Sequence, residues 1–278
     1  MEDDQNSILL SATIITYNEE RKIHDCIASV HDWCDEVLVL DSNSTDQTRE
    51  IAERFEKVKF LVHPFDGHIQ QKNRAIELSR GEWIISLDAD ERVTPELARS
   101  IQAYIKKNPR SPGARVKRLT RHLGRFIRYG GWYNARYRLL RRGCGKWGGE
   151  NPHDLIYLDE RPGWRSLRGP VLKGDLLHYS FFDLSDQIDT INKFSSIVAF
   201  TRAGRGKKFS LLKLLFKPPV KFIENYIVKL GFLDGVPGFM LAVSSSFAAF
   251  CKIAKLYELN RTDLERPGNL RKDYQVGE

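Results

Sequence analysis

The first 95 residues of the chain alternate between two hydrophobic patterns, and this alternation limits the possible folds more than any other feature. Short apolar runs rich in β-branched residues are typical of buried strands, and they occur at residues 8–17, 35–41, 58–63 and 82–88. Segments with apolar residues at helical spacing lie between them, and Thr94 followed by Pro95 predicts the start of another helix. Strands that alternate with helices form a parallel sheet with crossover helices. We therefore predict an α/β fold with a mainly parallel, Rossmann-like sheet.

Two local signals predict where helices of this region begin and end. Ser44 and Gln47 have the spacing of a capping box, which predicts that a helix opens there. Residues 68–81 have a helical pattern, and Gly81 is predicted to close that helix.

The pattern changes after about residue 110. Gly, Trp and Arg crowd residues 128–154, which predicts loops and short mixed strands, and a strand pattern returns at residues 171–181. From 183 to about 259 the pattern is helical, with breaks predicted at 204–206, 218–219 and 237–238. We therefore predict one domain over residues 1–182 and a helical C-terminal region over residues 183–278.

Composition limits the class of protein. The chain has 278 residues, 41% of them hydrophobic, which is enough for a large core. Its four cysteines show no CxxC spacing, which predicts no disulfide framework or zinc site and favours a reducing cytosol. The acidic, polar start predicts no secretory signal. The sequence contains no run of about 18 apolar residues, so we predict no membrane span. Residues 238–254 come nearest to such a run.

The net charge is +8, and most of the excess lies beyond residue 90. Such a balance favours an anionic partner, which could be nucleic acid, phospholipid headgroups or a phosphorylated substrate. For any single basic cluster, a solvated cationic face is the simpler interpretation.

Acidic residues follow the fourth predicted strand in the motif LDADE, residues 87–91. Asp88 and Asp90 are two positions apart at a strand end, so their carboxylates point the same way. Two converging carboxylates make a hard-oxygen site for Mg²⁺ or Mn²⁺, although an acidic loop that only solvates the strand end has the same residues.

Other polar residues should share that edge, because ligands of open α/β sheets bind at the carboxyl ends of the strands. Asp41 ends the second strand, and Asn18 and Glu19 follow the first in TYNEE. Lys72 and Arg74 in QQKNRA could face a diphosphate. The alternatives are a turn former for Asp41, a helix-start acid for Glu19 and a surface lysine for Lys72.

Together the segments ATIITYNEE, EVLVLDSNSTDQT and QQKNRAIELSRGEWIISLDADERVTPEL resemble family 2 glycosyltransferases, which have the GT-A fold. GWYNARYRLLRRG, PHD and LLHYSFFDLSDQI are similar to the lipopolysaccharide-core glucosyltransferase-like branch. The resemblance covers about residues 8–200. It implies an enzyme that transfers a sugar with inversion from a nucleotide-diphosphate donor. The implied nucleotide-binding residues are Thr16, Tyr17, Asn18, Glu19, Asp41, Lys72, Arg74 and Asp88; Asp88 would lie near the ribose or the metal, and Asp90 would bind the metal.

Inverting transfer needs a base that takes the proton of the acceptor hydroxyl. Asp154 of the PHD motif is the favoured candidate, standing where the branch usually has a glutamate, and Glu150 is the alternative. His153 could orient the acid or bind the acceptor, although the segment also reads as a Pro-containing turn. His178, on an apolar strand, is either a core histidine or a metal ligand.

Two basic segments raise the question of partners. Residues 130–143 mix aromatic side chains with arginines, as nucleic-acid sites and sugar sites both do, and the donor motifs favour a saccharide acceptor. Leu211, Leu212, Leu215 and Phe216 form an apolar stripe flanked by lysines, which favours an anionic membrane surface over packing on the catalytic domain.

The sequence therefore predicts a metal-dependent, inverting hexosyltransferase with a UDP-hexose donor. Its acceptor would be a saccharide or lipid-linked molecule of cell-surface polysaccharide or lipopolysaccharide core synthesis. The enzyme would be cytoplasmic and peripheral on the inner face of the cell membrane, with no nucleic acid partner. The alternatives are a sugar-nucleotide nucleotidyltransferase, against which TYNEERK lacks a glycine-rich loop, and a non-catalytic nucleic-acid-binding protein.

Overall fold

The computed structural model describes residues 9–150, 153–159 and 169–261. The chain forms two compact units, the first of residues 1–119 and 134–178 and the second of residues 120–133 and 179–278. We keep 1–182 and 183–278 as the proposed domain division; in the structure, the segment 120–133 is part of the helical unit.

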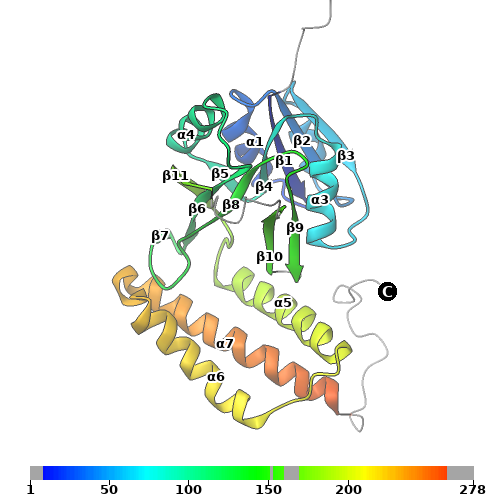
Figure 1. Ribbon diagram of the computed structural model, residues 1–278. Coiled ribbons are helices and arrows are strands. Elements are labelled where there is room, and N and C mark those ends of the chain that lie inside the picture. The colour runs from blue at the N-terminus through cyan, green and yellow to red at the C-terminus, as the bar shows by residue number, and fades with distance from the viewer. Residues whose placement is uncertain (1–8, 151–152, 160–168, 262–278) are drawn as a thin grey trace, which may run out of the picture. The chain divides into compact units, whose positions relative to one another are not determined.

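A mixed sheet forms the centre of the first unit (Figure 1). Its strand order is β3-β2-β1-β4-β8-β6-β11-β5, and the first four of these strands pair in parallel. Antiparallel pairs extend the sheet beyond β4. The strands are β1 (Leu10–Thr16), β2 (Glu36–Asp41), β3 (Val58–Val62), β4 (Trp83–Asp88), β5 (Glu91–Val93), β6 (Gly113–His122), β8 (Asn134–Arg141) and β11 (Val171–His178). A separate hairpin pairs β9 (Gly145–Glu150) with β10 (His153–Leu158).

Helices cover both faces of the parallel strands. They are α1 (Ile23–His31), the short α2 (Thr48–Ala52), α3 (His68–Leu78) and α4 (Pro95–Lys106). Side chains of β2 alternate between two clusters: Val37 and Val39 pack in the core that contains α1 and α4, whereas Leu38 and Leu40 pack against α3. Because successive side chains of a strand point to opposite faces, a strand apolar at every position is buried on both sides. The predicted α/β class and the four predicted parallel strands are thus confirmed.

Two predicted helix ends are wrong. No helix begins at Ser44, because its amide and hydroxyl instead donate to Asp41, and α2 starts only at Thr48. Helix α3 ends at Leu78 rather than at Gly81. A Cβ at position 81 would lie 2.6 Å from the Ser11 amide nitrogen, so Gly81 allows two backbone segments to approach closely. The prediction of Thr94 as a helix cap is confirmed, since its hydroxyl accepts from the Leu97 amide.

The second unit is mostly helical. It contains β7 (Arg125–Ile127), α5 (Leu184–Gly204), α6 (Leu211–Ile223), a π-helical turn η1 (Glu224–Val228), a 3₁₀ turn η2 (Gly231–Asp234) and α7 (Gly235–Asn260). The predicted break at 204–206 is confirmed. The breaks predicted at 218–219 and 237–238 are wrong, because α6 runs through Pro218 and Pro219 and α7 runs through Pro237 and Gly238. Gly231–Asn260 forms a helical stretch that, by length and composition alone, could cross a membrane. Only 22% of its most apolar part is buried within the protein.

Candidate active site

Three neighbouring strands end in register and define one edge of the sheet, which we call the rim. Thr16 of β1 pairs with Asp41 of β2, and Ile15 pairs with Asp88 of β4. The loops that follow β1 and β2 therefore leave the sheet beside the acidic loop that follows β4. This is the arrangement predicted for Asp41 and Asp88.

The loops after β1 and β2 are joined by side-chain to backbone hydrogen bonds. Asn18, at a left-handed φ of 53°, accepts through Oδ1 from the Thr45 amide at 2.8 Å, and its own amide donates to Ser44 Oγ at 2.8 Å. Asp41 Oδ2 accepts from the Ser44 amide at 2.8 Å. Asp41 and Asn18 thus fix the shape of the loops, which is the turn-forming role considered for Asp41.

The remaining residues of TYNEE differ in exposure. Tyr17 is 56% exposed at the rim, so its ring presents an open aromatic face. The Thr16 hydroxyl is buried, and no described residue hydrogen-bonds to it. Glu19 lies 3.3 Å from the Lys22 ammonium, and its backbone amide donates to Thr48 Oγ1 at 2.9 Å. Their roles in nucleotide binding stay predictions.

Lys72 connects two of the predicted acids. Its ammonium is 2.9 Å from Asp88 Oδ1 and 2.7 Å from Asp154 Oδ2, and its side chain is 5% exposed. The ammonium also lies 4.2 Å from the centroid of the Trp147 ring, within cation–π range. A lysine of helix α3 thus joins the end of β4 to the β9–β10 hairpin, and it is not a surface lysine.

A second cation reaches Asp88 from strand β8. Arg138 Nη2 is 3.3 Å from Asp88 Oδ2 and 2.6 Å from Glu91 Oε1. Glu91 is fully buried, and its Oε2 accepts from the Asp88 amide at 3.1 Å. Arg118 adds a third cation, 3.7 Å from Glu91. The acids at the end of β4 are therefore matched by Lys72, Arg138 and Arg118.

This network sets the protonation of its members. Burial opposes ionisation of Asp88, but Lys72 and Arg138 outweigh it and hold the pKa of that carboxyl well below its usual range. Burial raises the pKa of the Glu91 carboxyl despite the attraction of Arg138. For Arg138, burial is outweighed by Glu91 and Asp88, which raise the pKa of its guanidinium.

Asp90 and His178 form a separate pair. His178 Nε2 lies 3.3 Å from Asp90 Oδ2, and Asp90 Oδ1 is buried with no hydrogen-bond partner among the described residues. Burial opposes ionisation of Asp90, but His178 outweighs it and lowers the pKa of the carboxyl. The structure thus brings together two of the predicted metal ligands, Asp90 and His178.

Other predicted residues lie apart or outside the described side chains. Arg74 forms a two-armed ion pair with Asp66, at 2.8 and 3.2 Å, and a 3.1 Å bond to Gln71 Oε1. It is not a member of the Asp88 network. Glu150 and His153 are paired in the β9–β10 hairpin, but their side chains lie outside the described atoms.

Sequence reasoning missed three residues. Glu91 and Arg138 lie on strands, and a charged residue on a buried strand face signals a partner on another strand. The Trp147 ring lies within cation–π range of both Lys72 and Arg138. Its Nε1 donates to Ser86 Oγ at 3.1 Å, and its backbone amide donates to Asn73 Oδ1. The tryptophan therefore holds the cations in place.

The family comparisons agree with this geometry. The family model described as Glycosyl transferase family 2 matches residues 11–151. The chain belongs to glycosyltransferase family 2. It is therefore an enzyme of the glycosyltransferase class, as the motifs predicted, and family membership favours this class over nucleotidyltransferases.

Two curated relatives span nearly the whole chain. LpsC of Rhizobium meliloti (strain 1021), a lipopolysaccharide core biosynthesis glycosyltransferase, is 30% identical over 255 residues, which cover 90% of this chain and 92% of LpsC. RT0209 of Rickettsia typhi, an uncharacterized glycosyltransferase, is 30% identical over 264 residues, covering 90% of this chain and 87% of the relative. Among solved structures, S. aureus TarS 1-349 matches with a TM-score of 0.44 and 16% identity over 90% of each chain.

Proposed function

We propose that this glycosyltransferase moves a hexose, with inversion, from a UDP-sugar to a saccharide or lipid-linked acceptor in lipopolysaccharide core synthesis. One observation carries the proposal. The candidate base Asp154 and the rim acid Asp88 share the same lysine, at 2.7 and 2.9 Å, although they come from different parts of the chain. Similarity to LpsC over 90% of the chain supports the lipopolysaccharide core as the setting.

The proposed transfer forms one bond, breaks one bond and moves one proton. The acceptor hydroxyl oxygen forms a bond to the anomeric carbon while the bond from that carbon to the diphosphate oxygen breaks, and the electron pair leaves with the diphosphate. We assign the hydroxyl proton to Asp154. Its Oδ2 accepts from Lys72, so Oδ1 is the oxygen that we assign to the proton.

A divalent cation fits the rim. Asp90 Oδ1 is a buried carboxylate oxygen without a partner in the described part of the chain, and the His178 imidazole lies beside the other oxygen. Among the described residues there is no group of three or more acids, histidines or cysteines of metal-site geometry. Mg²⁺ and Mn²⁺ need no such group, because they keep several waters and bind through one or two carboxylates plus substrate phosphates. When bound, the cation would neutralise charge on the departing diphosphate.

The nucleotide would lie along the loops that Asn18 and Asp41 shape, with the exposed Tyr17 ring open to the base. Lys72 and Arg138 hold Asp88 ionised and in place, so that the carboxylate can meet the ribose or the cation. These are positioning roles for both cations.

The deciding experiment is a donor screen. Melting temperatures measured with UDP-, GDP- and dTDP-hexoses in Mn²⁺ should rise for a true donor, because a ligand that binds the folded state stabilises it. We expect the largest rise for a UDP-hexose, and we expect chelation or Asp90→Asn to remove it while the unliganded melting temperature changes little. A UDP-hexose rise that persists in both tests would overturn metal dependence.

We also propose that the protein is cytoplasmic and is attracted to the inner face of the cell membrane. The lysines near α6 support this, since each basic residue near an anionic surface contributes about 1 kcal/mol. Replacement of Lys207, Lys208, Lys213 and Lys217 by Gln should weaken binding to anionic vesicles and leave donor hydrolysis intact.

A further inference from the structure

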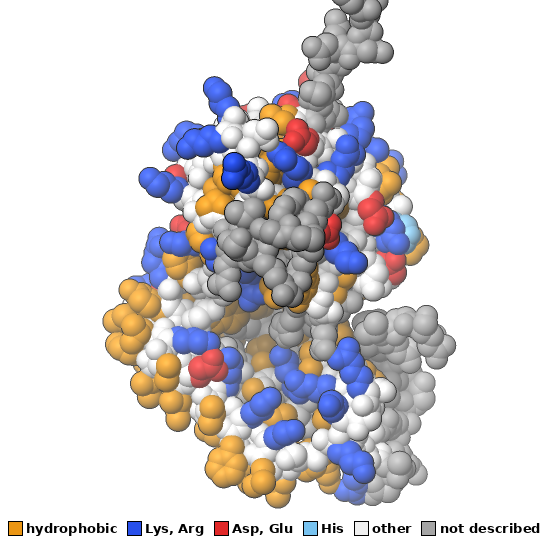
Figure 2. Space-filling model, viewed as in Figure 1, with side chains coloured by type: hydrophobic (Ala, Val, Ile, Leu, Met, Phe, Trp, Pro, Cys, Tyr) orange, Lys and Arg blue, Asp and Glu red, His pale blue; other side chains and the backbone are white. Residues whose placement is uncertain are grey.

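Exposed apolar side chains gather on one part of the second unit. Among the described residues, 17 of the 29 large hydrophobic side chains that are exposed lie between Leu211 and Tyr257. They belong to α6, η1, η2 and α7, which we call the helical hairpin, residues 211–260. Figure 2 shows apolar side chains along the outer edge of these helices. Monomeric soluble proteins rarely expose contiguous patches of this kind without a partner.

The exposed residues follow helical spacing on both arms of the hairpin. On α6 they form one stripe, and on α7 they recur three or four positions apart opposite its buried face. The α6 stripe is Leu211, Leu212, Leu215, Phe216, Val220 and Ile223, and the α7 stripe is Val236, Phe239, Val243, Phe247 and Phe250. The tip between the arms adds Ile227, Val228, Leu230, Phe232 and Leu233. The two arms and the tip therefore present one continuous set of apolar groups.

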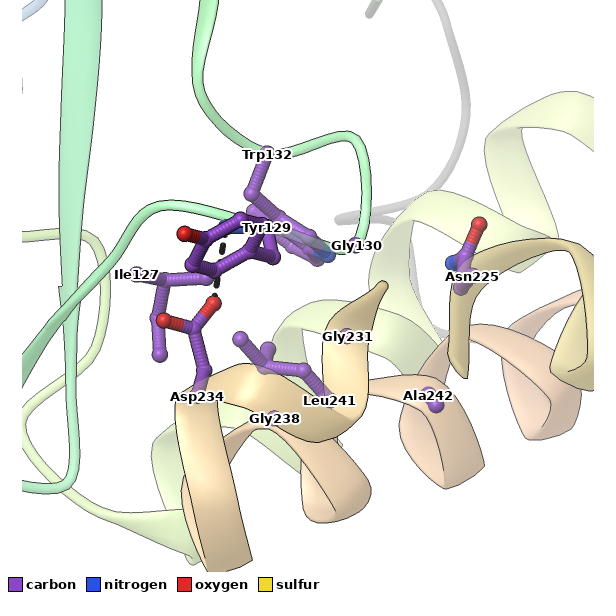
Figure 3. A pocket seen from close by; sticks show the side chains of 10 residues that line it. All are labelled: Ile127, Tyr129, Gly130, Trp132, Asn225, Gly231, Asp234, Gly238, Leu241 and Ala242. Atoms are coloured by element: carbon purple, nitrogen blue, oxygen red, sulfur yellow. Dashed lines mark hydrogen bonds between the residues drawn. The ribbon is translucent and has the colours of Figure 1, made fainter. Parts of the chain in front are cut away.

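Buried contacts hold the backbone at the tip of the hairpin. Asp234 is buried and accepts from the Arg128 amide and, at 2.8 Å, from the Tyr129 amide; Figure 3 shows the Asp234 contact. Gly238 packs so closely that a Cβ there would lie 2.1 Å from the Gly231 carbonyl oxygen. These contacts fix the backbone that carries the exposed apolar groups of the tip.

Positive charge lines the hairpin. Residues 205–260, which include the hairpin, contain nine Lys and Arg and three acids, a net charge of +6. Of the acids, Glu224 is paired with Lys221 and Lys229, and Asp234 is buried. A second copy of the chain would bring the same charge to the interface and be repelled. An anionic surface, in contrast, would be attracted by the positive charge of the hairpin.

Cations of two other helices act on Lys252 of α7. Arg202 of α5 and Lys217 and Lys221 of α6 each repel the Lys252 ammonium electrostatically. Burial, and then the three neighbouring cations, lower the pKa of the Lys252 ammonium. Such a concentration of positive charge favours an anion such as a phosphate group.

The opposite face of α7 packs against α5, and this packing argues against a membrane-spanning α7. Lys255 donates to Asn192 Oδ1 and Ser196 Oγ of α5 at 2.7 Å each, and Ser244 bonds Gln187 Oε1 at 3.4 Å. A spanning α7 would have to break these bonds and place Lys252 and Lys255 in hydrocarbon, where charge is costly. An amphipathic helix lying in the interface keeps them.

We propose that the helical hairpin inserts its apolar stripes and tip into the acyl region of an anionic bilayer, with Lys217, Lys221 and Lys252 at the level of the lipid phosphates. This goes beyond adsorption through lysines, because insertion buries apolar surface that salt does not screen. It does not depend on the proposed sugar transfer.

The test is sedimentation with vesicles of equal parts phosphatidylglycerol and phosphatidylcholine, in low salt and in about 1 M NaCl, where the Debye length is only about 3 Å. The tip variant is Phe232→Ser with Leu233→Ser, whose side chains are each 46% exposed. Its matched control is Leu184→Ser with Ile188→Ser on α5 of the same unit, with side chains 42% and 47% exposed. Circular dichroism melting checks that both variants fold.

We expect the wild type and the α5 control to remain bound in high salt, and the tip variant to lose about tenfold or more in partition coefficient, as expected for two large apolar groups. Three results would each overturn the proposal: no vesicle binding at any salt, binding that high salt abolishes, or equal losses in the tip and control variants. Light scattering adds a fourth. A dimer that the tip variant converts to monomer would identify a second copy as the occupant. Donor hydrolysis measured without vesicles tests the catalytic proposal separately.

Discussion

Lys72→Met would remove the cation that Asp88 and Asp154 share. Breaking a buried ion pair by deleting one partner costs about 3–5 kcal/mol, because the other charge stays buried. Asp88 keeps Arg138 at 3.3 Å, but Asp154, only 11% exposed, loses its 2.7 Å partner. We therefore expect the lower part of that range, about 3 kcal/mol, and most of it should come from Asp154.

Urea unfolding at neutral pH, followed by circular dichroism, would measure this loss. Lys106→Met on the exposed face of α4 is the matched control, and it should change the free energy of unfolding by no more than about 0.5 kcal/mol. A double-mutant cycle with Asp154→Asn isolates the pair. Once the Asp154 charge is absent, Lys72→Met should cost less, with a coupling of about 2 kcal/mol.

Two results would refute this reasoning. One is a Lys72→Met protein as stable as the Lys106→Met control. The other is a cycle without coupling, because additivity would mean that Lys72 and Asp154 do not stabilise each other in solution.

Three further outcomes are expected. Asp154→Asn should lower turnover about 100-fold or more with donor affinity unchanged in a titration, and Glu150→Gln should have a milder effect; the reverse order would move the base to Glu150. Glu36 is buried, and although burial opposes its ionisation, hydrogen bonds lower the pKa of its carboxyl. Its stabilisation should be present above the unfolded pKa of about 4.3 and be lost as pH falls through the lower folded value, so unfolding curves of Glu36→Gln and wild type should converge in acid. Gly238→Ala should destabilise by about 1–3 kcal/mol, as overpacking does, whereas Gly204→Ala, with nothing within 4 Å of its Cβ, should not; equal melting temperatures would contradict the tight contact.

The parallel strands and the rim could be predicted because their signals are local. Runs of β-branched residues identify strands, and a parallel sheet places the ends of β1, β2 and β4 on one edge. The ion pairs at the rim could not be predicted in the same way. Lys72 meets Asp154 across 82 positions, and Arg138 meets Glu91 across 47, and no local pattern encodes such pairings.

The wrong predictions arose where a local sequence pattern is compatible with more than one local structure. Ser44 has the spacing of a helix cap, but its hydroxyl and amide donate to Asp41, and its hydroxyl oxygen accepts from the Asn18 amide instead of from a helix amide. Pro218 and Pro219 normally end a helix, yet α6 continues through them beside α7, and the Ser246 hydroxyl donates to the Pro218 carbonyl. Packing between the helices overrode the local preference.

The division of the chain has a consequence for how the protein is made. The polypeptide enters the helical unit at residues 120–133, returns to the first unit, and leaves it again after His178. On the ribosome, the Tyr129 amide is therefore synthesised 105 residues before Asp234, the carboxylate that binds it. A nascent chain, or a fragment cut after His178, carries every described rim residue together with a loop whose partner has not been made. Such fragments should need a chaperone or tend to aggregate until the last helices emerge.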